Sequence, residues 1–67
     1  MKELIRKLRL ALYLNQTEFG TLIGVKRGTV CNYESGHRLP QLRTVKLMVD
    51  IAKENKIEFN PEEFYKK

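Results

Sequence analysis

Apolar residues in this chain recur every three or four positions, the spacing of amphipathic helices rather than of strands. The first stripe predicts a helix over about residues 2–13, and a later stripe predicts a longer helix from Gln41 or Leu42 to about Asn55. In the first helix the apolar face holds Leu4, Ile5, Leu8 and Leu12. In the longer helix the core face holds Leu42, Val45, Met48, Val49 and Ala52.

A shorter helix is predicted between these two, starting at about Gln16. Asn15 and Glu18 have the spacing of a capping box, in which each side chain accepts a hydrogen bond from the other residue's backbone N–H. Gly24 would end this helix, because glycine enters the left-handed region without steric cost. The apolar face of the helix holds Phe19, Leu22 and Ile23.

Another short helix follows after a tight turn, in which the side chain of Val25 is expected to be buried. It begins directly after that turn and has Val30 and Tyr33, three positions apart, on its inner face. Glu34-Ser35-Gly36 closes it. Residues 15–36 are therefore predicted to form two helices joined by a turn, and this pair is the candidate reading unit of the chain.

The remaining segments are a loop and a tail. Pro40 disfavours helix in the residue before it, so residues 36–40 are predicted to be a loop. Asn60-Pro61-Glu62-Glu63 combines a cap, a proline at the first helical position and acids in the first turn, which predicts a short tail helix within residues 60–66. The whole chain, residues 1–67, is predicted to be one compact all-α domain of five helices.

The positive charge of the chain is concentrated in its first two thirds. Residues 1–43 hold eight Lys and Arg against three acids, whereas residues 44–67 hold five of each. The net charge of +5 therefore lies in residues 1–43, the part of the chain that contains the predicted helix pair. A polyanion is the natural partner of such a surface. On charge alone, the interpretation that the basic residues only keep a small protein in solution is equally good.

The chain lacks the groups that an enzyme or a metal site would need. It has one cysteine, Cys31, and one histidine, His37, so we predict no disulfide, no metal site and no catalytic centre. No glycine-rich phosphate loop is present in the sequence. No apolar run approaches the length of a membrane span or a secretory signal, so we expect no membrane contact and a cytoplasmic location at the nucleoid. We expect no enzymatic activity and no cofactor.

Together these features resemble the lambda-repressor-like helix-turn-helix family, also called the Cro/C1 or XRE type. The matching residues are Leu14-Asn15-Gln16-Thr17-Glu18-Phe19, Gly24-Val25, Thr29-Val30, Tyr33-Glu34-Ser35-Gly36, and Pro40 through Val45. The resemblance covers about residues 3–52. It implies a five-helix domain whose second and third helices form the reading motif. It also implies a transcription regulator, often a homodimer on a double-stranded DNA operator with two half-sites.

The same resemblance implies roles for individual residues. The base-reading positions of the third helix are Arg27, Gly28, Thr29 and Asn32. The positions that would contact the DNA backbone are Gln16, Lys26, Arg38 and Arg43. Arg9 and Glu34 resemble the family's internal ion pair, which would lock the first helix to the third and give Arg9 a structural role. By the chemistry of base edges, Arg27 would pair with guanine and Asn32 with adenine, and the Thr29 methyl would meet a thymine methyl.

Three features depart from the family pattern. Lys26 replaces the Ser or Thr that usually caps the third helix, so a phosphate could take the place of the cap. Gly28 removes a side chain from a usual base-reading position, which either allows close approach of the backbone or narrows what can be read. The segment after Ile51 is longer than the compact pattern. It carries aromatic residues that we expect to be buried at a homodimer contact or against the first helix, namely Phe59, Phe64 and Tyr65.

The leading interpretation is a sequence-specific transcription regulator, most typically a phage- or plasmid-type repressor with its third helix in the major groove. The alternative is an antitoxin that keeps the fold and binds a toxin or another protein through the aromatic tail. A protein-interaction module without DNA binding is the third interpretation, and the presence of Lys26 and Arg27 disfavours it.

Overall fold

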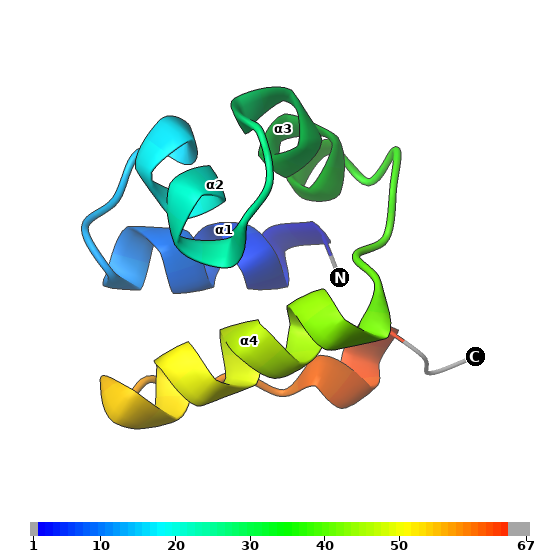
Figure 1. Ribbon diagram of the computed structural model, residues 1–67. Helices are drawn as coiled ribbons and strands as arrows, with labels where there is room; N and C mark the ends of the chain where they lie inside the picture. Colours follow the sequence, from blue (N-terminus) through cyan, green and yellow to red (C-terminus); the bar gives the residue numbers. More distant parts are fainter. Residues whose placement is uncertain (1, 65–67) are drawn as a thin grey trace.

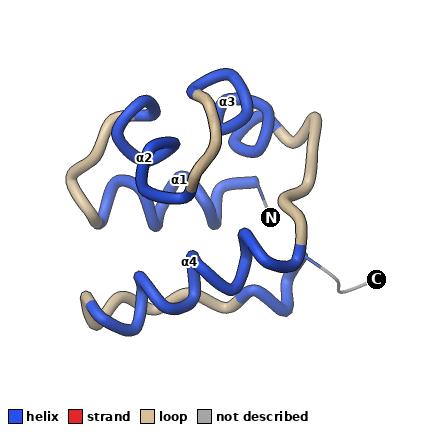
Figure 2. The backbone as a smooth tube through the Cα atoms, viewed as in Figure 1, coloured by secondary structure: helices blue, strands red, loops and turns tan. Residues whose placement is uncertain are grey.

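The computed structural model describes residues 2–64, and within that range it contains four α-helices, one short 3-10 helix and no strand (Figure 1 and Figure 2). The α-helices are α1 (Lys2–Ala11), α2 (Gln16–Ile23), α3 (Arg27–Ser35) and α4 (Leu42–Glu54). The 3-10 helix η1 spans Pro61–Phe64. In the view of Figure 1, α1 runs between the α2–α3 pair and α4.

Each α-helix contributes one face to a shared core. The buried core residues are Ile5, Leu8, Phe19, Ile23, Val30, Tyr33, Val45, Met48, Ala52 and Phe59. Removing a side chain the size of leucine or phenylalanine from water contributes roughly 1.5–3 kcal/mol. This burial holds together helices of 8 to 13 residues, which are marginal in water when isolated.

Two predicted core positions are wrong. Leu42 is 61% exposed, because it is the first residue of α4 and lies beyond the edge of the core. Thr44 takes the buried position at that end, with 7% of its surface exposed. Leu22 is also exposed. Phe19 and Ile23 lie four positions apart and form the buried face of α2, which leaves Leu22 beside that face rather than on it.

The helix ends of the α2–α3 pair confirm the local sequence signals. The backbone N–H of Glu18 donates to Asn15 Oδ1 at 2.8 Å, and the backbone N–H of Asn15 donates to Glu18 Oε1 at 2.9 Å. Gly24 ends α2 with a φ of 79°, and Gly36 ends α3 with a φ of 83°. Both glycines are in the left-handed region, as a glycine cap predicts.

The first helix ends earlier than the sequence predicts. It stops at Ala11 rather than near Tyr13, because Tyr13 has a φ of 59° and turns the chain into the left-handed region. The N–H of Leu14 donates to the carbonyl of Arg9 at 3.3 Å and closes this turn. The chain then enters α2 two residues later.

The prediction of five helices is not confirmed. Pro61–Phe64 forms a single 3-10 turn, which is too short for a continuing α-helical hydrogen-bond ladder. Residues 65 and 66 of the predicted tail helix lie outside the described residues. Phe59 is buried as expected, and it packs into the core of its own chain, in the cluster that holds Ile5 and Leu8 of α1. Tyr65 and the side chain of Phe64 are also outside the description.

Gly20 sets the distance between α2 and the turn that leads into α3. A Cβ at this position would lie 2.6 Å from the carbonyl oxygen of Val25 and 3.3 Å from a methyl group of Val30. The Val25 N–H also donates to the Gly20 carbonyl at 2.8 Å. The backbone of the turn therefore rests directly on α2, and only a residue without a Cβ allows this approach.

Replacing Gly20 by alanine should lower the free energy of unfolding by about 1 kcal/mol. Overpacking costs about 1–3 kcal/mol, and the better helix propensity of alanine offsets up to about 1 kcal/mol of that. Gly28→Ala is the matched control, since a Cβ at Gly28 meets nothing within 4 Å, and it should leave stability unchanged or raise it. Urea unfolding compares the two variants. Equal stability would contradict the close-packing argument.

Candidate nucleic-acid interface

The outward face of α3 carries the long polar side chains of the helix. Val30 and Tyr33 are buried, whereas Arg27, Cys31 and Asn32 are exposed. With about 100° of rotation per residue, these three side chains lie on one side of the helix. Exposed Gly28 and Ser35 lie on the same side and complete the outward face.

Sequence reasoning gave Cys31 no role in contacting a partner, yet it lies in the middle of the outward face. Its thiol is free and exposed. The signal that places it there is helical spacing, because Cys31 follows Arg27 by four positions. Thr29 was predicted to read bases, yet its side chain is half-buried and lies at the border of the outward face. The predicted base-reading residues therefore do not form one continuous row.

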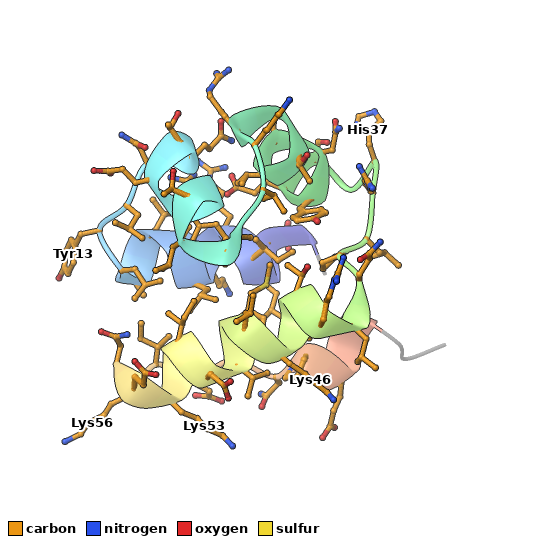
Figure 3. All side chains as sticks on the ribbon, in the orientation of Figure 1. Tyr13, His37, Lys46, Lys53 and Lys56 are labelled. Atoms are coloured by element: carbon orange, nitrogen blue, oxygen red, sulfur yellow. The ribbon has the colours of Figure 1, made fainter. Side chains whose placement is uncertain are left out.

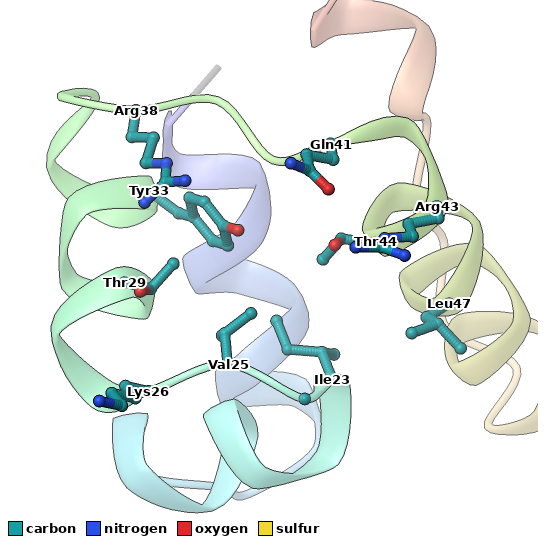
Figure 4. Close-up of a pocket in the computed structure, with 11 residues that line it drawn as sticks. Ile23, Val25, Lys26, Thr29, Tyr33, Arg38, Gln41, Arg43, Thr44 and Leu47 are labelled. Atoms are coloured by element: carbon teal, nitrogen blue, oxygen red, sulfur yellow. The ribbon is translucent and has the colours of Figure 1, made fainter.

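A cleft of 460 Å³ lies along one flank of α3 (Figure 4). Its lining combines the α2–α3 turn, the inner edge of α3, the α3–α4 loop and the start of α4. Three cationic residues line it, one from each of the turn, the loop and α4: Lys26, Arg38 and Arg43. No acidic residue is among the described residues that line it. The apolar part of the lining comes from Ile23, Val25, Tyr33 and Leu47.

The cleft brings together three of the four residues predicted to contact a DNA backbone. Lys26, Arg38 and Arg43 are all exposed, so their charged groups remain free to meet an anion in solvent. In Figure 4, Lys26 and Arg38 lie on the α3 side, and Arg43 lies across from them on α4. Thr29 also lines this cleft and is therefore adjacent to the predicted backbone contacts.

Gln16, the fourth predicted backbone contact, lies on the other flank of α3. It is the first residue of α2, and its Nε2 donates to Glu34 Oε1 at 3.3 Å. Glu34 is seven positions after Arg27, so Glu34 and Arg27 lie almost on the same line along α3, at one edge of the outward face. The outward face of α3 thus lies between Gln16 on one side and the cationic cleft on the other.

Arg9 and Glu34 form an ion pair between α1 and α3. Arg9 Nε lies 2.6 Å from Glu34 Oε2, and Arg9 Nη2 donates to Glu34 Oε1 at 3.1 Å. The side chains are 12% and 8% exposed. Arg9 Nη1 also donates to the carbonyl of Leu14 at 3.0 Å. The hydrogen bond to Glu34 raises the pKa of Arg9, against burial, which lowers it. Arg9 is thus engaged inside the fold.

The start of α3 has no side-chain cap. Lys26 occupies the N-cap position and makes no cap hydrogen bond. The backbone N–H groups of a first helical turn favour an anion, and this turn opens beside the cationic cleft. The departure from the usual Ser or Thr is therefore consistent with a phosphate as the acceptor.

Comparison with known proteins gives one match. The family model described as helix-turn-helix matches residues 5–53 of the chain. No curated protein and no solved structure matches it. The matched segment contains α2, α3, the cleft and the Arg9–Glu34 ion pair, whereas η1 lies beyond it. Among the described residues, no helix combines the length and apolar character that crossing a membrane requires.

Replacing Glu34 by glutamine should lower the free energy of unfolding by about 1–3 kcal/mol, because the mostly buried Arg9 loses its counter-charge. Glu18→Gln is the matched control. Glu18 is exposed, and glutamine serves as well as glutamate in a capping box, so its stability should change little. Thermal or urea unfolding at neutral pH measures both. An equal loss of stability in Glu34→Gln and Glu18→Gln would show that the ion pair stabilises the fold no more than an exposed carboxylate does.

Proposed function

This chain belongs to the Cro/C1-type helix-turn-helix family of DNA-binding transcription regulators, and we propose that it is a repressor of a specific double-stranded operator. The observation that supports this best is the flanking of α3 by Gln16 on one side and by the cleft of Lys26, Arg38 and Arg43 on the other. The same proposal puts the protein in the cytoplasm, at the nucleoid, where its operator would be.

In this proposal the outward face of α3 enters the major groove, which is wide enough to admit one helix. Arg27 reads a guanine through its O6 and N7 atoms, and Asn32 reads an adenine through N6 and N7. Gly28 lets the helix approach the bases closely. Thr29, at the border of the cleft, meets the edge of the groove, where its methyl group can contact a thymine or its hydroxyl a phosphate.

The two flanks of α3 match the two DNA strands that bound a major groove. Gln16 contacts the phosphates of one strand, and Lys26, Arg38 and Arg43 contact those of the other. Such contacts fix position and register but carry no sequence information. The outward face therefore selects the sequence, and the flanks provide salt-dependent affinity.

Two copies on one operator are part of the proposal. One α3 offers two long reading side chains, and each good bidentate pair gives about 1–3 kcal/mol of discrimination, so a second half-site strengthens selection. Copies on the same face of DNA meet at an edge of their DNA-binding surface. Leu39 and Leu42 are exposed at such an edge, beside Arg38 and Arg43, and we infer that the copies touch there.

The antitoxin alternative has less support than the repressor proposal. It relied on an exposed aromatic tail, and Phe59 is buried in the core of its own chain. The remaining tail aromatics are Phe64, whose side chain is not described, and Tyr65, which lies outside the described residues.

Selection from a random duplex pool at about 150 mM salt should enrich an inverted repeat with half-sites about one helical turn apart. Arg27→Ala should relax the preference at one base pair of each half-site. Arg43→Ala, a change of the same chemistry at the flank, should weaken all sequences alike. Equal loss of selectivity in both variants would contradict the division between reading face and flanks, and a pool without enrichment would contradict sequence-specific binding.

Leu42→Glu should convert a dimer to a monomer, because it would bring like charges together at the proposed contact between copies. Leu22→Glu is the control, since Leu22 is similarly exposed but lies on α2. Sedimentation with and without operator DNA measures the assembly state. The inferred contact is wrong if Leu42→Glu sediments as the unchanged protein does.

A further inference from the structure

Two hydroxyl groups on opposite walls of the cleft have no partner within the described fold. Tyr33 of α3 is 5% exposed and Thr44 of α4 is 7% exposed, so both residues are more than nine-tenths buried. Both of them line the cleft. In Figure 4 the Tyr33 hydroxyl points from α3 across the cleft toward Thr44. Neither hydroxyl makes a hydrogen bond to any of the described residues.

The fold does not require either hydroxyl. No side-chain oxygen among the described residues is both fully enclosed and without a partner, so the oxygens of Tyr33 and Thr44 must reach the space of the cleft. Phenylalanine and valine would fill the same volumes in the core without a polar atom to satisfy. A buried side chain whose one polar atom opens into a cleft takes its hydrogen-bond partner from outside the fold.

The other polar groups of the cleft show that this partner is an anion. Lys26, Arg38 and Arg43 carry positive charge, and the described lining contains no acidic residue. Thr29 and Gln41 add neutral groups that can also donate hydrogen bonds. An anion that accepts from both walls at once must present oxygens in different directions. A tetrahedral phosphate does so, whereas the two oxygens of a carboxylate lie together at one end of the group.

The apolar part of the lining distinguishes two sources of phosphate. Val25 is half-buried and Leu47 is 46% exposed, so both present carbon surface to the cleft. A free phosphate ion has no apolar part that could cover them. A phosphodiester of a DNA backbone has deoxyribose carbons on both sides, and these can lie against Val25 and Leu47. The cleft also runs along the flank of α3 where the proposed function puts one DNA strand.

We propose that the cleft binds one backbone phosphodiester of the DNA, with the Tyr33 and Thr44 hydroxyls donating to its non-bridging oxygens. This inference rests on the proposed function and adds two positioning residues to it, both neutral and both buried. Long Lys and Arg side chains adopt many rotamers, so they can follow a phosphate over a range of positions. The two hydroxyls are held in place by the packing of α3 and α4, so they fix the strand at one position relative to α3.

Tyr33→Phe removes one hydroxyl and keeps the ring, so its stability in urea should equal that of the unchanged protein. Its affinity for a mixed-sequence duplex should fall by about tenfold, because a hydrogen bond to a charged group is lost. Tyr13→Phe is the matched control, since Tyr13 is 94% exposed, lies outside the cleft lining and extends outward at the end of the molecule away from His37 (Figure 3). The DNA affinity of Tyr13→Phe should be unchanged.

Salt dependence separates the hydroxyls from the cations of the cleft. A neutral donor releases no counterion, so Tyr33→Phe and Thr44→Val should each lower the affinity by the same factor at every salt concentration. Arg43→Ala should instead reduce the slope of log affinity against log salt by about one. Inorganic phosphate is the second probe, followed through the amide NMR signals of Tyr33 and Thr44. It should not saturate these signals at the concentrations at which the duplex does.

The proposal is overturned if Tyr33→Phe binds the duplex as tightly as Tyr13→Phe does, or if its loss of affinity comes with a changed salt slope. Thr44→Val decides the matter if Tyr33→Phe proves unstable. Saturation by inorganic phosphate at the duplex concentrations would assign the cleft to free phosphate and overturn the proposal as well. Affinity that depends on both hydroxyls, in a protein that enriches no sequence from the random pool, would contradict the proposed repressor function alone.

Discussion

One carboxylate, that of Glu34, connects three of the four α-helices. It lies on α3, pairs with Arg9 of α1 at 2.6 Å and accepts from Gln16 of α2 at 3.3 Å. Arg9 extends the connection to the carbonyl of Leu14, just before α2 begins. Because both side chains of the ion pair are mostly buried, an unpaired partner would be costly. One polar contact beside the core therefore links α3 to α1 and to the start of α2.

The same contact shapes the charge of the outer surface. Of the three acids in residues 1–43, Glu34 is used by Arg9, and Glu18 is used by the capping box of α2. The cations beside α3 consequently face solvent without a nearby acid in the cleft lining. The net charge of the chain alone did not distinguish a solubility role from a polyanion partner. The internal use of these two acids favours the second interpretation, because it leaves Lys26, Arg38 and Arg43 in a cleft whose described lining holds no acid.

Sequence signals that act over a few residues were reliable, and the errors at Leu42 and Leu22 fell where burial depends on how helices meet. The capping box of Asn15 and Glu18 and the left-handed glycines need only their own neighbours, and the structure confirms them. Leu42 has the right spacing for the core face of α4, yet whether that first turn reaches the core depends on the neighbouring helices. The end of the first helix was also misplaced: it was predicted near Tyr13, but α1 ends at Ala11 and the backbone turns at Tyr13.

The residues of the candidate site were likewise predicted without their arrangement in space. The family motif predicted Lys26, Arg38 and Arg43 as separate positions. Only the tertiary structure shows that they line one cleft and that Gln16 lies apart from it. It also shows how sparse the outward face is, since Gly28, Cys31 and Ser35 are small and leave Arg27 and Asn32 as its long side chains. At about 1–3 kcal/mol for each good base contact, two such residues specify little sequence. A regulator built this way would depend on its flanks for affinity and on a second copy for selectivity.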